Sequence, residues 1–294
     1  MITVSVADVL FYVTAATYVV ASVLFLRFLV RGTGEEGERL APRLVAAGAA
    51  LHAAHIVVSS LVLRVCPVEG IHFPMSVASM LMCVAYLWGR ARYRVEVAGA
   101  FVAPLALTSL LASRFVAVSD PGKSVRGVLL PFHVTMNLVG IALFALAFSA
   151  ATLYLVQERL VKRKRIDGVS RRLPPLDALD RAEHRFLLAG FPLLTIGIVT
   201  GTVWAGRVES GAPGEVLRAV FGYVTWLVIA GVLFLRAAAG WRGRRAAYGT
   251  IAGFGLAVAV LVIYLVRGQA SPPQRAATSA LDAASSSVLA GGAR

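Results

Sequence analysis

Long apolar runs dominate this chain and restrict what it can fold into. Hydrophobic residues make up 58% of the sequence and charged residues only 15%. Eight runs are almost entirely apolar, at residues 8–30, 42–63, 72–89, 96–118, 129–156, 185–204, 215–236 and 247–266. About 20 apolar residues in a helix span the roughly 30 Å hydrocarbon core of a bilayer. The sequence therefore predicts an all-α, polytopic bundle of about eight transmembrane helices.

The basic residues are concentrated in alternate connections between these runs. Twenty of the 29 Lys and Arg residues fall in or beside the first, third, fifth and seventh connections. Positive residues collect in the cytoplasmic loops of membrane proteins, so both termini are predicted to lie outside. The formal net charge of +14 is therefore explained by basic loops that set the membrane topology and contact lipid headgroups, and nucleic-acid binding is not predicted.

Residues 1–267 are predicted to form one transmembrane domain, because no remaining stretch is long enough for a separate soluble domain. Residues 268–294 are rich in Ser, Ala and Pro and are predicted to form a disordered tail. The first apolar run has no basic leader and no small-residue cleavage site, so we expect a retained helix and not a signal peptide. The expected location is the bacterial inner membrane, which the chain crosses several times.

Histidines are the candidate functional side chains, because an imidazole in a membrane helix must face the bundle interior or a wet cavity. His133 is expected at the outer end of the fifth helix and His55 in the outer half of the second. For both, a functional role and a packing role remain open. His52, His72 and His184 are interpreted first as packing residues, with His72 at the outer start of the third helix.

Other motifs predict little chemistry. His52 and His55 share one helical face, but two ligands fall short of the three or four protein ligands usual in zinc sites. Cys66 and Cys83 are about 17 residues of helix apart, too far for a disulfide. No phosphate-binding loop, dinucleotide glycine pattern, Ser-His-Asp set or paired carboxylate occurs, so intrinsic catalysis is not predicted. The scarcity of intramembrane acids argues against a proton-coupled transporter.

Three segments carry a resemblance to a known family. They are "HVTMNLVGIALFALAFSAATLYLVQE" from His133, "RLPPLDALDRAEHRFLLAGFPLLTIGIVTGTVWAG" from Arg172 and "TWLVIAGVLFLRAAAGWRGRRAAYGTIAGFG" from Thr225. Their order and spacing resemble the cytochrome c assembly family, the CcsA/CcmC-type group of polytopic haem-handling proteins. The resemblance covers most of residues 40–265, and the eight-helix outline is similar to the HemX-like and YpjD-like branches.

The resemblance implies a cofactor and a set of ligands. His133 matches the external histidine that supplies an axial iron ligand in haem-handling members, and His55 is similar to the intramembrane histidine on the path of haem across the bilayer. His72, also predicted outside, is the candidate for a second axial ligand. Haem is thus the implied cofactor, haem binding or transfer in cytochrome c biogenesis the implied function, and another cytochrome c assembly protein the implied partner. No metal other than haem iron is expected.

Three departures from the family pattern support an alternative. The interval between Trp204 and Trp226 lacks the tryptophan-rich motif of haem-handling members. Phe234 and Leu235 stand where the family has a histidine before the arginine, and an external histidine beyond the last apolar run is missing. The alternative function is a non-catalytic membrane scaffold or regulator of haem (tetrapyrrole) metabolism without a functional haem site.

The basic connection at residues 159–185 offers that alternative a docking surface. Within it, "RRLPPLDALD" predicts an extended Pro-Pro segment that leads into a helix, with Asp177 or Asp180 as the N-cap.

Overall fold

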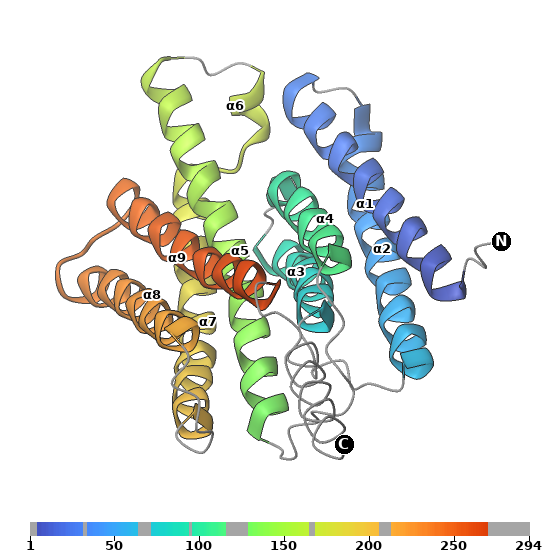
Figure 1. The fold of residues 1–294 in the computed structure, drawn as a ribbon. Coiled ribbons are helices and arrows are strands. Elements are labelled where there is room, and N and C mark those ends of the chain that lie inside the picture. The colour runs from blue at the N-terminus through green and yellow to red at the C-terminus, as the bar shows by residue number, and fades with distance from the viewer. Residues whose placement is uncertain are drawn as a thin grey trace, which may run out of the picture.

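The computed structural model of the chain describes residues 5–31, 34–63, 72–93, 96–115, 129–164, 168–205 and 213–269. All regular structure in these residues is helical, which confirms the predicted all-α class (Figure 1). The elements are α1 (Val6–Arg31), α2 (Gly34–Leu63), α3 (His72–Tyr93), the short 3₁₀ helix η1 (Glu96–Ala98), α4 (Gly99–Phe115), α5 (Leu129–Lys162), α6 (Val169–Arg172), α7 (Leu176–Ala205), α8 (Pro213–Ala238) and α9 (Arg244–Gln269).

Six segments of the described chain are long and apolar enough to cross a membrane. They are Val6–Arg31, Arg39–Leu61, Glu96–Arg114, Phe132–Lys162, Leu176–Val203 and Ala219–Ala238. The chain is therefore a multi-pass membrane protein in a lipid bilayer. The helices α3 and α9 occupy the other two predicted spans, and the total of eight spans, like the orientation with both termini outside, stays a prediction.

The helices extend beyond the apolar runs that predicted them. α5 continues to Lys162, and α7 begins at Leu176 where the apolar run predicted residue 185. Apolar patterning marks only the part of a helix immersed in lipid, whereas backbone hydrogen bonding continues into charged ends. The predicted basic connection is thus largely helical, and it also contains α6. The tail was predicted to begin at residue 268, whereas α9 continues to Gln269, and residues 270–294 lie outside the described residues.

The antiparallel helices α5 and α7 form the centre of the bundle and make its most extensive helix contact (Figure 1). The α1–α2 pair and the α3–α4 pair lie on one side of α5, α8 lies against α7 on the other, and α9 crosses α5 obliquely. The buried core of α5 is rich in small residues, namely Ala142, Ala145, Ala147, Ala150 and Ala151. Such residues allow helix backbones to approach closely in a membrane, where lipid offers no hydrophobic drive for association.

Glycines of α7 bring this helix against α5. A Cβ atom on Gly190 would lie 2.7 Å from Cε1 of Phe144, and one on Gly197 would lie 2.4 Å from Oδ1 of Asn137. Real side chains essentially never pack this closely, so a larger residue at either position would force Phe144 or Asn137 out of the observed contact.

A buried ion pair joins α7 to α8 and to the start of α9. Nη2 of Arg236 lies 2.5 Å from Oδ2 of Asp180, and the two side chains are only 7% and 6% exposed. Oδ1 of Asp180 also accepts a 2.7 Å hydrogen bond from the backbone N–H of Gly243. Next to it, Thr250 donates a 2.6 Å hydrogen bond to the fully buried Glu183. The prediction of Asp177 or Asp180 as the N-cap is wrong, because α7 begins at Leu176 and both residues belong to the helix, with the Asp180 carboxylate bound to Arg236.

Replacing Arg236 by alanine tests this ion pair. Arg236→Ala leaves the Asp180 carboxylate without its buried cation and with only the exposed Arg242 nearby, so we expect a loss of about 3–5 kcal/mol in the free energy of unfolding. The matched control is Arg181→Ala, since Arg181 pairs with Asp177 on the exposed side of α7, and there we expect less than about 0.5 kcal/mol. Denaturant unfolding in detergent measures both, and equal losses would contradict the assignment.

Candidate functional site

His133 lies in the second turn of α5, where the side chain faces the end of α7. α5 begins at Leu129, and Pro131 falls in its first turn, where a missing backbone N–H costs no helical hydrogen bond. Nδ1 of His133 is 2.6 Å from the carbonyl oxygen of Gly197 in α7. The site therefore joins the two central helices of the bundle.

This hydrogen bond fixes the tautomer of the neutral His133 ring. A carbonyl oxygen only accepts, so Nδ1 must carry the proton and donate it to Gly197. Nε2 of the neutral ring then keeps its lone pair, which is the form that binds a metal ion. A backbone acceptor also holds the ring plane in one orientation.

Small and polar residues surround the His133 ring. A Cβ atom on Gly201 would lie 2.5 Å from Cε1 of His133, so this glycine leaves the space that the imidazole fills. The amide of Asn137, one turn further along α5, donates a 2.8 Å hydrogen bond to the carbonyl oxygen of His133 and lies 3.4 Å from Nε2. The hydroxyl of Thr200 is 3.4 Å from Nδ1. The half-buried ring thus has polar neighbours on both helices.

His55 shows the same pattern in a different helix pair. Nδ1 of His55 in α2 is 2.9 Å from the carbonyl oxygen of Ala7 in α1, so Nδ1 again carries the proton and Nε2 keeps the lone pair. The edge of the ring packs against Phe11, with 5.6 Å between ring centroids. The guanidinium of Arg114 in α4 lies over the ring of Phe11, 5.3 Å from its centroid, and forms a 2.5 Å ion pair with Asp8.

His52 has hydroxyl partners on both ring nitrogens. Nε2 lies 2.8 Å from Oγ of Ser76 in α3, and Nδ1 lies 3.3 Å from the hydroxyl of Tyr18 in α1. The ring is completely buried. Hydrogen bonds between helices are what the packing interpretation of His52 requires. The His52 ring lies close to the His55 ring, with 6.2 Å between the centroids, but both of its nitrogens already have hydroxyl partners.

The candidate ligands are not gathered into one site. His55 lies between α2 and α1, whereas His133 lies between α5 and α7. His72 is the first residue of α3, and its side chain lies outside the described part of the structure. Within the described residues, Cys83 is a buried free cysteine and no group of three or more His, Cys, Asp and Glu residues has the arrangement to hold a metal ion.

Sequence reasoning missed the residues that hold His133. Gly197 and Gly201 form a Gly-x-x-x-Gly spacing, which in an apolar helix predicts close contact with another helix. His133 and Asn137, spaced four residues apart, share one face of α5. These two signals are present in the sequence, but only the fold pairs them.

Comparison with known proteins identifies the family of this chain. Residues 67–269 match the family model described as "Cytochrome C assembly protein". The matched segment contains the central α5–α7 pair and His133, and it leaves out α1, α2 and His55. The chain belongs to the cytochrome c assembly protein family.

Curated relatives match a shorter part of the chain. Proteins named "Cytochrome c biogenesis protein CcsA" are 42% identical over 89 residues in Synechococcus elongatus and 38% identical over 105 residues in Crocosphaera subtropica. These matches cover 30% and 36% of this chain, and 26% and 30% of the relatives. The chain thus spans less than a third of the length of these relatives. No solved structure matches the chain.

Adding a methyl group at Gly201 tests the packing of His133. Gly201→Ala places a Cβ against the imidazole, so we expect it to lower the free energy of unfolding by about 1–3 kcal/mol. In the His133→Ala background the same substitution should cost less than about 0.5 kcal/mol, because the clash is gone.

The control is Gly222→Ala in α8, where no atom lies within 4 Å of the added Cβ. Unfolding in detergent measures all four variants. An equal loss from Gly201→Ala in both backgrounds would show that His133 does not fill this space.

Proposed function

We propose that this protein binds and hands on haem in cytochrome c biogenesis, with Nε2 of His133 as an axial ligand of the iron. The hydrogen bond from Nδ1 to Gly197 carries this proposal, because it leaves Nε2 with the lone pair that haem iron binds. Membership of the cytochrome c assembly family supports the process, and relatives named for cytochrome c biogenesis support it further.

His55 is proposed as a second haem contact on an internal path. Its proton is also donated to a backbone carbonyl, so its Nε2 is in the ligand form as well. Phe11 at its edge supplies an apolar wall of the kind that a porphyrin prefers. Because His55 and His133 lie in different helix pairs, we assign them to successive positions of haem and not to one six-coordinate site. His72 remains the proposed second ligand beside His133.

The chain's own residues orient and limit this chemistry. Haem, when bound, supplies the iron that needs one or two neutral nitrogen ligands. Gly197 holds the His133 proton on Nδ1, Gly201 keeps room for the ring, and the Asn137 amide stands 3.4 Å from Nε2. These three residues act as positioning residues, since they act through His133. The bacterial inner membrane is the proposed location, and a partner that presents an apocytochrome is the proposed recipient.

A membrane scaffold or regulator of haem metabolism is the second candidate. It is favoured by Phe234 and Leu235, which stand where the family pattern has a histidine; Phe234 is 68% exposed on α8. The missing tryptophan-rich segment between Trp204 and Trp226 also favours it. In this case His133 serves only to pack α5 against α7.

Hemin titration of the detergent-purified protein separates the two functions. We expect wild-type protein to give a Soret band and, after reduction, α bands of ligated haem. His133→Ala should shift these bands and weaken hemin binding by at least about tenfold, as losses of metal-site residues do. His184→Ala is the matched control, since His184 lies near the start of α7, whereas His133 contacts the other end of this helix.

Two results would decide against haem handling by this site. Protein that takes up no hemin would favour the scaffold, and spectra unchanged by His133→Ala would remove His133 as a ligand. His72→Ala tests the pairing in the same way: if His133 and His72 bind one haem, both variants should change the bands.

A further inference from the structure

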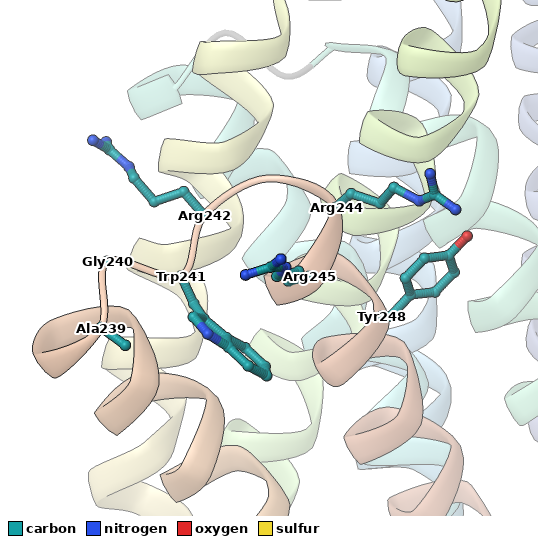
Figure 2. A pocket seen from close by; sticks show the side chains of 7 residues that line it. All are labelled: Ala239, Gly240, Trp241, Arg242, Arg244, Arg245 and Tyr248. Carbon is teal, nitrogen blue, oxygen red and sulfur yellow. The ribbon is translucent and has the colours of Figure 1, made fainter.

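A hollow of about 580 Å³ lies at the turn between α8 and α9. It is lined by Ala239, Gly240, Trp241, Arg242, Arg244, Arg245 and Tyr248 (Figure 2). The turn lies against Asp180, near the start of α7, and thus at the end of the bundle that is predicted to be cytoplasmic. Three arginines and two aromatic side chains therefore meet where a membrane helix pair leaves the bilayer.

Two glycines give the turn its shape. Gly240 and Gly243 both have a positive φ of 64°, a conformation that L side chains rarely adopt. The backbone N–H groups of Ala239 and Trp241 both donate to the carbonyl of Leu235, at 2.9 and 3.2 Å, and so tie the turn back to the end of α8. Asp180 accepts from the N–H of Gly243 and so fixes the other side of the turn. The backbone hydrogen bonds of the turn therefore set the shape of the hollow.

The hollow carries uncompensated positive charge. Asp180 is neutralised by Arg236 and lies 3.6 Å from Nε of Arg242. In the described part of the chain, no carboxylate lies within ion-pair distance of Arg244 or Arg245. Arg244 instead lies over the ring of Tyr248, 5.6 Å from its centroid, and Arg159 of α5 approaches the hydroxyl of the same tyrosine.

The helix that precedes the hollow, α8, exposes apolar side chains. Phe234, less than two turns before the end of α8, is 68% exposed, and Leu227 on the same helix is 60% exposed. Figure 2 shows the Arg245 guanidinium on the same side of the turn as the Trp241 ring, while Arg242 points away. An indole beside a guanidinium at a helix end is the arrangement found where a membrane surface meets water.

We propose that this hollow binds the phosphate of an anionic phospholipid, with Arg245 as its main cation, Arg244 as a second, and the exposed apolar side of α8 against the acyl chains. The site is independent of haem. Arginine suits a phosphate because its planar group donates two parallel hydrogen bonds. Basic pockets between membrane helices on the cytoplasmic side bind anionic headgroups for the same reason.

Native mass spectrometry of the delipidated full-length protein tests this site with added phosphatidylglycerol or phosphatidylcholine. We expect tighter binding of phosphatidylglycerol, and about a fivefold loss of that affinity in Arg245→Gln. Arg163→Gln is the matched control, because it removes one exposed arginine just beyond the predicted cytoplasmic end of α5 that does not line the hollow. It should leave the affinity unchanged.

A second measurement locates the lipid. Brominated phosphatidylglycerol should quench the fluorescence of wild-type protein more than that of Trp241→Phe, whereas brominated phosphatidylcholine should show no such difference. Equal effects of Arg245→Gln and Arg163→Gln, or equal binding of the two lipids, would overturn the proposal. Displacement of the lipid by millimolar inorganic phosphate would also overturn it, since it would assign the hollow to a free anion.

Discussion

The close approach of α5 and α7 is the constraint on which the rest of the bundle depends. Glycines at 190, 197 and 201 form one stripe on α7, and His133, Asn137 and Phe144 fill the space that they leave. In a bilayer such contacts gain their energy from van der Waals packing and from hydrogen bonds between helices. The same contact that stabilises the bundle therefore sets the position and the tautomer of its candidate ligand.

Electrostatic contacts hold the opposite end. Asp180 takes a hydrogen bond from the turn before α9 and an ion pair from α8, so one carboxylate joins three helices. A buried charge of this kind is costly unless every partner is in place. The end of the bundle at His133 is thus fixed by shape and neutral hydrogen bonds, and the end at Asp180 by charge.

The sequence was sufficient for the fold class and the family, because apolar length and residue order carry those signals, whereas the role of the candidate histidines stays a prediction. It was insufficient for helix ends, since hydrophobicity stops at the lipid boundary while α7 begins earlier, at Leu176. Asp180 illustrates the difficulty: a carboxylate near a helix start resembles an N-cap, and only the tertiary position of Arg236 shows otherwise. Likewise, the Gly-x-x-x-Gly spacing at 197 and 201 predicts some close partner but cannot specify His133.

Arg172 in α6 donates hydrogen bonds of 3.2 and 2.9 Å to the carbonyl oxygens of Phe28 and Leu29, near the end of α1. These carbonyls have no intrahelical partner at a helix end. Their partner lies more than 140 residues downstream, so during synthesis the first helix enters the membrane with this end satisfied only by water or headgroups. α1 packs mainly on α2 and α4, which are made earlier, so only the contact with Arg172 has to wait until α6 has been made.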